Sequence, residues 1–135
     1  MKRWSAPLAC AAAMLLSGCS STPGDLESKA APAVVTYPEN YQEIYRRVSS
    51  AARQCMAGNV GAYASMAVDT DLFPDLGYGE VRTSLINWGV RNYYLSIKIE
   101  KAAAGSRMTI KSGNTLGAER MIQSAQRWAT GDQSC

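Results

Sequence analysis

Histidine is absent from this sequence of 135 residues. Without histidine the chain cannot build the Ser-His-Asp or Cys-His catalytic arrangements, and it lacks the most common ligand of protein zinc and copper sites. Carboxylate chemistry and a Ser-Lys pair remain, but no Ser-x-x-Lys pattern occurs after residue 36. We therefore expect a protein that is not an enzyme and that holds no metal or other cofactor.

The chain also lacks an apolar run that is long enough to span a bilayer. Residues 6–16 are almost entirely apolar, but a helix of this length at ~1.5 Å per residue falls well short of a hydrocarbon core of ~30 Å. Lys2 and Arg3 precede the run, and small residues follow it. This arrangement is typical of a secretory signal peptide, which we place at residues 1–18.

Residues 16–19 read Leu-Ser-Gly-Cys. This pattern resembles the lipobox of bacterial lipoproteins. The resemblance implies cleavage before Cys19 and attachment of three acyl chains, palmitate among them, to its thiol and its new amino group, which anchors a protein stably in a membrane. Ser20, not aspartate, follows the cysteine. In a Gram-negative lipoprotein this implies the outer membrane, with the domain facing the periplasm or, alternatively, the cell surface. An ordinary signal peptide followed by an incidental cysteine is the other interpretation.

Basic residues outnumber acidic residues only slightly. The full chain holds 14 lysine and arginine residues against 11 aspartate and glutamate residues. Removal of Lys2 and Arg3 with the signal peptide leaves 12 against 11. This balance and a secreted address both argue against nucleic acid as a partner.

Cysteine is scarce as well, with four in the chain. Cys10 leaves with the signal peptide and Cys19 carries the lipid, so Cys55 and Cys135 remain in an oxidising compartment. We expect these two to form a disulfide; two free thiols are the alternative. The bond would close a loop of 80 positions and fix the last residue to the body of the domain.

Residues 19–36 are rich in serine, proline, alanine and threonine, and no apolar periodicity persists in them. We interpret this stretch as a lipidated flexible tether with a mean span of roughly 20–25 Å. Residues 37–135 then form a single domain, because a chain of this length can bury one hydrophobic core.

Periodicity predicts two helices that flank a set of strands. One helix starts at Pro38 and ends before Gly58, and the other follows residue 115. Strands are expected in between, at residues 63–68 (weakly), 78–86, 90–101 and 107–111. Each strand has one apolar and one polar face, and each helix has one apolar stripe. We therefore expect an α+β fold: a two-layer sandwich of order α-β-β-β(-β)-α, with an antiparallel sheet and both helices on one face.

Three aspartates, Asp69, Asp71 and Asp75, fall in a stretch at residues 69–77 that reads as a loop. Calcium binds such carboxylates, but the stretch lacks the glycine and the glutamate that an EF-hand needs, so a solvated turn is the better interpretation. A carboxylate enzyme would need at least one of these groups in a cleft with a raised pKa.

The polar face of the predicted sheet carries more basic than acidic groups. The candidate partner-binding residues are Arg82, Lys98, Arg107 and Lys111 on this face, together with Trp88 at a hairpin tip. An anionic partner such as lipopolysaccharide phosphate, or a partner protein, would fit them. A solvated face with cross-strand ion pairs is the simpler interpretation, and for Trp88 burial at the end of the sheet is favoured over exposure.

The leading functional hypothesis is a non-catalytic, outer-membrane-anchored periplasmic lipoprotein. It would bind an envelope protein of unknown identity, as an assembly or accessory factor. The order of elements resembles that of accessory lipoproteins of envelope biogenesis, although the domain matches no named family by motif. The alternative is a carrier of a small molecule or lipid, which requires an apolar cavity of ~300 Å³ or more between helices and sheet.

Overall fold

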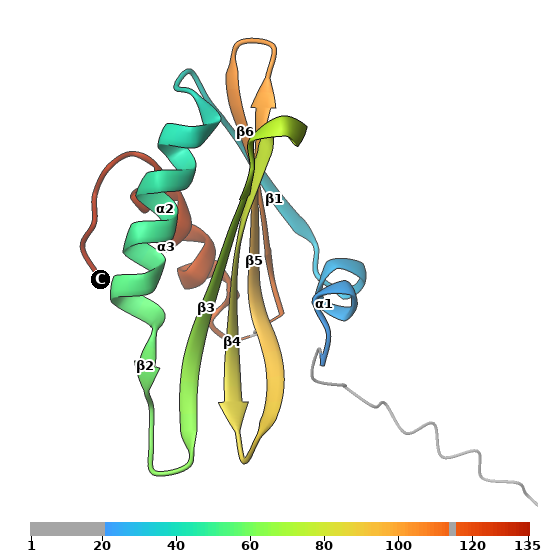
Figure 1. The fold of residues 1–135 in the computed structure, drawn as a ribbon, viewed down its shortest axis with the longest axis vertical. Coiled ribbons are helices and arrows are strands. Elements are labelled where there is room, and N and C mark those ends of the chain that lie inside the picture. Colours follow the sequence, from blue (N-terminus) through green and yellow to red (C-terminus); the bar gives the residue numbers. More distant parts are fainter. Residues whose placement is uncertain (1–20, 114–115) are drawn as a thin grey trace, which may run out of the picture.

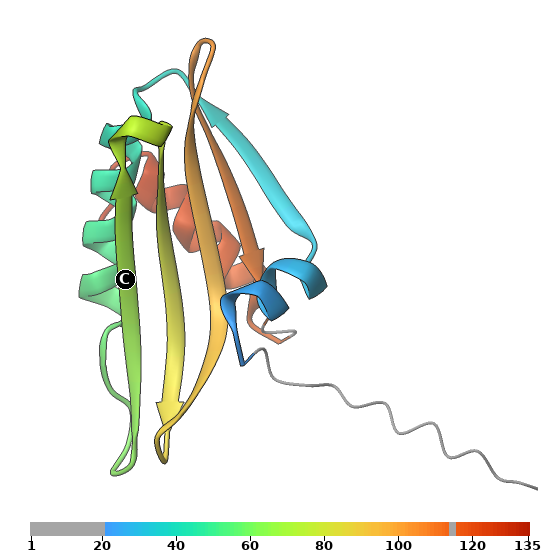
Figure 2. The same cartoon turned by 45° about the vertical axis from the view of Figure 1, so that its right-hand side comes forward.

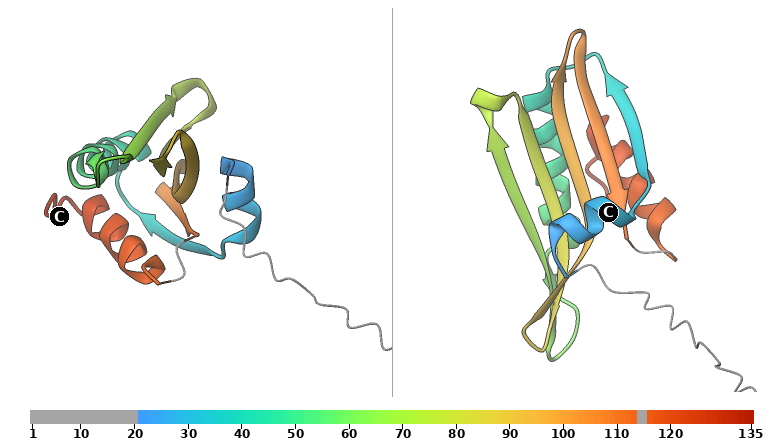
Figure 3. Two further views of the ribbon diagram at one scale, coloured as in Figure 1. Left: turned by 90° about the horizontal axis from the view of Figure 1, so that it is seen from below. Right: turned by 90° about the vertical axis from the view of Figure 1, so that its right-hand side faces the viewer.

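The computed structural model describes residues 21–113 and 116–135. Six strands form one antiparallel sheet in the order β1-β6-β5-β4-β3-β2. Helices α2 (Tyr41–Met56) and α3 (Ala118–Ala129) lie against one of its faces (Figures 1 and 3). The strands are β1 (Pro32–Tyr37), β2 (Gly58–Asn59), β3 (Ala64–Phe73), β4 (Tyr78–Asn87), β5 (Val90–Ala102) and β6 (Gly105–Ser112). The expected α+β sandwich, with these two helices on one face, is confirmed.

Helix α2 begins at Tyr41, after the expected start at Pro38, because Asn40 caps it. The Asn40 side chain accepts a hydrogen bond from the backbone N–H of Gln42 at 2.8 Å, which satisfies one of the free donors of the first turn. The apolar stripe of the helix then faces the sheet, as its three- and four-residue spacing predicted. Its buried apolar members are Tyr41, Ile44, Val48, Ala51 and Ala52.

The core lies between the sheet and these two helices. In the middle of the sheet, Ile97 of β5 lies opposite Val81 of β4 and Ile110 of β6, and all three are fully buried. Ala125, Trp128 and Ala129 of α3 join the same cluster as the stripe of α2. Burial of these side chains supplies the main favourable term for folding.

A glycine on β4 sets how closely α2 approaches the sheet. A Cβ atom at Gly79 would lie 2.5 Å from Cδ2 of Tyr45, so only a residue without a side chain leaves room for this ring. Gly79 is itself buried. The close approach therefore depends on this position in the sequence.

The disulfide expected between Cys55 and Cys135 is present, with the two Cα atoms 5.2 Å apart. It joins the end of α2 to the last residue of the chain. Hydrogen bonds support the same segment: Gln133 Nε2 donates to the carbonyl of Arg47 at 3.3 Å, and Trp128 Nε1 donates to the carbonyl of Ser134 at 3.1 Å. The C-terminus is thus part of the fold.

The tether expected at residues 19–36 is wrong for most of its length. A short helix, α1 (Pro23–Lys29), packs on the sheet face opposite α2 and α3 (Figures 2 and 3), and β1 pairs along its whole length with β6. Thr22 and Asp25 form a capping box, and Leu26 is only 1% exposed. The ordered domain therefore includes residues that the sequence analysis gave to the tether, while Cys19 lies outside the described residues.

Two local expectations also need correction. Residues 69–73 continue β3, and Pro74–Leu76 form a 3₁₀ turn, η1, so most of the supposed loop is regular structure. The register between β4 and β5 shifts at Thr83/Ser84 of β4, which brings Tyr93 of β5 opposite Ser84. Simple alternation had put Tyr93 on the same face as Leu95. The Asn87-Trp88-Gly89 hairpin is confirmed as the connection between β4 and β5.

Candidate partner-binding surfaces

The sheet face opposite α2 and α3, here named the open face, carries the four basic residues singled out from the sequence. Residues that lie directly opposite one another in antiparallel strands point to the same face. The register therefore arranges this face in three rows: Asp69-Arg82-Ser96-Lys111, Asp71-Glu80-Lys98-Thr109 and Phe73-Tyr78-Glu100-Arg107.

Helix α1 covers one end of the first row. Glu27 accepts a hydrogen bond from Ser96 Oγ at 2.5 Å and pairs with Lys111 Nζ at 3.0 Å. Partial burial raises the pKa of Glu27, but the hydrogen bonds from Ser96 and Lys111 outweigh it and hold the pKa below its usual value. Lys111 also donates to the backbone carbonyl of Glu27 at 2.6 Å. Its ammonium group is thus engaged by α1.

Two carboxylates, one on its own strand and one on β3, compensate the charge of Arg82. Its guanidinium pairs with Glu80 on the same strand and with Asp71 on β3, the latter at 3.7 Å. Asp69 pairs with Arg91 of β5 at 2.7 Å. The two aspartates that looked like loop residues are therefore the acidic partners in an ion-paired surface, and at half-exposed positions such pairs contribute little stability each.

The third row and Lys98 of the second row form a surface of mixed aromatic and charged character, here named the upper patch: Phe73, Tyr78, Lys98, Glu100 and Arg107. Phe73 packs against Tyr78 with ring centroids 4.9 Å apart, and Lys98 Nζ lies 4.8 Å from the centroid of the Tyr78 ring. Lys98 also pairs with Glu100 at 2.8 Å. Arg107 is exposed and forms no ion pair with any described residue.

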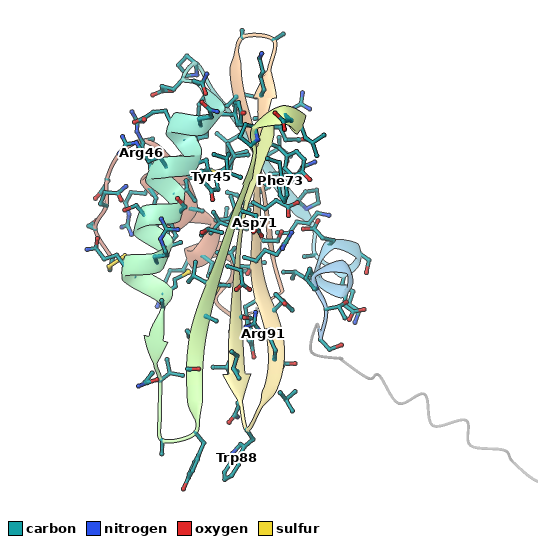
Figure 4. The ribbon with its side chains drawn as sticks, viewed as in Figure 1. Tyr45, Arg46, Asp71, Phe73, Trp88 and Arg91 are labelled. Carbon is teal, nitrogen blue, oxygen red and sulfur yellow. A yellow bond between two sulfur atoms is a disulfide. The ribbon has the colours of Figure 1, made fainter. Side chains whose placement is uncertain are left out.

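Trp88 lies far from the upper patch, at the opposite end of the sheet (Figure 4). It is 74% exposed, so the expectation of burial was wrong. Its ring stacks on Tyr63 with centroids 4.3 Å apart, and its backbone N–H donates to the Tyr63 carbonyl at 3.2 Å. The chain segment between β2 and β3 thus lies beside the β4–β5 turn, and two aromatic rings meet at this end.

The backbone at Trp88 is unusual. Its φ is 50° and that of Gly89 is 77°, as in a tight two-residue hairpin turn in which both central residues are left-handed. Asparagine or glycine adopts this conformation at lower cost than a bulky side chain. A tryptophan held here in an exposed position therefore indicates a role for the ring outside the core.

Two surface hollows are lined mainly by polar groups. One, of about 450 Å³, lies between α2 and the C-terminal segment, and Arg46, Arg47 and Gln133 are among its lining residues. The other, of about 430 Å³, lies beside η1 and includes Tyr41 and Lys101. Neither is the apolar cavity between helices and sheet that a carrier would need.

Within residues 21–113 and 116–135, no group of three or more cysteine or acidic residues could hold a metal ion. Asp69 and Asp71 are engaged by arginines, and Asp75 is exposed on η1. These aspartates therefore do not converge on a common position for a ligand.

Sequence reasoning missed three parts of these surfaces: Leu26 and Glu27 on α1, Tyr63 beside Trp88, and Phe73 in the upper patch. The signals were present for two of them. Thr22-Pro23-Gly24-Asp25 is a capping sequence with proline in the first turn. In residues 68–73, every second residue is uncharged (Val68, Thr70, Leu72), and the residues between them are Asp69, Asp71 and Phe73. No local pattern indicated that Tyr63 would stack on Trp88.

No protein-family model matches this chain, and no curated protein matches it. In the described part of the chain, none of the helices is long and apolar enough to cross a membrane.

Proposed function

We propose that this protein is a non-catalytic lipoprotein, anchored in the outer membrane through Cys19, whose domain binds a partner protein of the cell envelope. The upper patch is the observation that carries the protein-binding part of this proposal. The Leu-Ser-Gly-Cys pattern at residues 16–19 supports the anchor.

The composition of the upper patch suits a protein partner. Aromatic residues and arginine are enriched in the centres of protein interfaces, where they supply most of the binding energy. Phe73 is 37% exposed beside Tyr78, and Leu76 on the adjacent η1 is 69% exposed. Arg107 adds an exposed charge that no described residue neutralises, so an acidic group of a partner can pair with it.

Site-specific photo-crosslinking tests the binding surface. We expect a photoreactive residue at position 73 to give a discrete protein adduct in membranes, and the same residue at the exposed position of Arg120 on α3 to give none. Arg107→Glu should reduce the adduct formed from position 73, whereas Arg120→Glu, the matched charge change on the other side of the molecule, should leave it unchanged. Equal adducts from both positions would contradict the proposal.

The anchor has its own test. Intact mass spectrometry of the membrane-extracted protein should give residues 19–135 with three acyl chains, and a mass two daltons lower without reduction than with it, because one disulfide is intact. A chain without acyl groups would refute the lipid anchor but would leave the upper patch to be tested separately.

A further inference from the structure

One end of the molecule exposes an uncharged aromatic surface, here named the aromatic end: Val60, Tyr63, Trp88 and Val90. Their exposed fractions are 59%, 66%, 74% and 59%. The four residues come from the segment between β2 and β3 and from the β4–β5 turn, which lie side by side at the lower end in Figures 1 and 4.

Charge is missing from this end. Residues 54–68 and 83–90 contain no lysine, arginine, aspartate or glutamate. The nearest charge along β5 is Arg91, which pairs with Asp69. Protein interfaces usually have a polar, charged rim around their apolar centre. A surface of tryptophan, tyrosine and valine, bordered by the Arg91–Asp69 ion pair, instead resembles the side chains that lie at the boundary between lipid headgroups and acyl chains.

The position of α1 brings the anchor to the same end. The chain enters α1 at the lower end of the helix, on the side of the two hairpin turns (Figures 1 and 2). Thr22, the N-cap, lies three positions after Cys19, a span of at most about 11 Å. Because α1 lies obliquely across the sheet (Figures 2 and 3), only part of its helical rise, roughly 7 Å from Thr22 to Glu27 at ~1.5 Å per residue, adds to this span.

The distance from Glu27 to the aromatic end is somewhat larger than this span. Glu27 is fixed to Ser96, and Ser96 lies six positions from Val90 on β5, which corresponds to roughly 20 Å at ~3.3 Å per residue. Cys19 can therefore lie closer to the level of the aromatic end than α1 does. With the flexible tether expected from the sequence at residues 19–36, no such relation between anchor and domain would exist.

We propose that the aromatic end inserts Trp88, with Tyr63 beside it, into the headgroup region of the same bilayer that holds the acyl chains of Cys19. This inference rests on the lipid anchor proposed above. The domain then has two membrane contacts, one covalent and one through the aromatic rings, and its long axis stands away from the membrane. The left-handed turn at Trp88 serves to direct the ring outward, beyond the last strand residues.

Tryptophan fluorescence can test this arrangement in the lipidated protein reconstituted into vesicles of phosphatidylethanolamine and phosphatidylglycerol. The mature chain has two tryptophans, and only Trp88 is exposed, since Trp128 is 2% exposed. We expect brominated acyl chains to quench the emission of Trp88 and vesicles to shift it to shorter wavelength. Trp88→Phe should abolish both effects.

The matched control moves the reporter to the other end. Leu76 on η1 is 69% exposed, close to the 74% of Trp88. In a Trp88→Phe background, Leu76→Trp should give an emission that brominated lipids leave unchanged. Co-flotation with vesicles and the intact mass report the acyl anchor independently of the tryptophans. A lipidated protein that floats while Trp88 is not quenched would overturn the inference alone, whereas a protein without acyl chains would remove both the anchor and the inference.

Discussion

Loss of the Cys55–Cys135 disulfide should lower the free energy of unfolding by about 2–4.5 kcal/mol. The bond closes a loop of 80 positions, and the chain-entropy treatment of a loop of this size gives roughly 4.5 kcal/mol as its ceiling. Domains of this size are stable by only about 5–15 kcal/mol in total. The bond therefore accounts for a large share of the stability, although the native contacts around it stay in place after reduction.

Urea unfolding of a Cys19→Ser chain, oxidised and reduced, measures this effect. Trp128 is a suitable reporter because it is buried and donates to Ser134 beside the bond. Besides the drop in stability, the dependence of the unfolding free energy on urea should steepen on reduction, since the unfolded chain becomes less compact. The Cys55→Ser/Cys135→Ser variant should match the reduced protein.

Gln133→Ala is the control for local contacts. It removes only the hydrogen bond to the carbonyl of Arg47, so a loss of about 1 kcal/mol or less is expected, with an unchanged urea dependence. If reduction lowered the free energy of unfolding by no more than Gln133→Ala does, the loop-closure argument would be refuted. The terminal segment would then be held by its local contacts alone.

Three further predictions concern α1 and the sheet. Leu26→Ala should cost about 2–5 kcal/mol in urea unfolding, since the side chain is 1% exposed, whereas a residue of a flexible tether would cost almost nothing. Gly79→Ala should cost about 1–3 kcal/mol because the new methyl group would meet the Tyr45 ring, and the cost should be smaller in a Tyr45→Ala background. The lowered pKa of Glu27 makes its contribution to α1 docking fully present above about pH 4.5 and lost as the pH falls through the folded-state pKa. The hydrogen-exchange protection factors of residues 23–29, which are corrected for the intrinsic pH dependence of exchange, should therefore fall in acid, and less so in Glu27→Gln.

The sequence predicted the elements whose hydrophobic periodicity continues over many residues. The stripe of α2 repeats over four turns, and β5 alternates over most of its 13 residues, so both were recognised. The disulfide followed from the number of cysteines and the expected compartment. In each case the information lies within one segment or in a simple count.

The elements that were missed depend on partners far away in the chain. Helix α1 has seven residues and buries only Leu26, so no apolar period could appear. Strand β1 is stabilised by pairing with β6, 69–79 positions later, and Val34 on the open face remains 55% exposed. A segment rich in serine and proline therefore looked like a linker until its partners were placed beside it.

The acidic extension of β3 was missed for a different reason. Asp69 and Asp71 are uncommon in strands, and their presence suggested a turn. In the structure they alternate with Thr70 on a half-exposed strand, and arginines of β4 and β5 pair with them. Charge complementarity across a sheet is invisible to a local pattern until the register is known.

The two proposed surfaces constrain each other through the length of the sheet. The 13 residues of β5 span roughly 40 Å from the aromatic end to the β5–β6 turn. If the aromatic end lies at the bilayer, the upper patch is held well beyond the headgroups, where a soluble domain or the periplasmic part of another membrane protein can reach it. Because α1 is docked on the open face instead of forming a flexible tether, the fold would then restrict this orientation. A partner that binds the upper patch would therefore meet it at a defined height above the membrane.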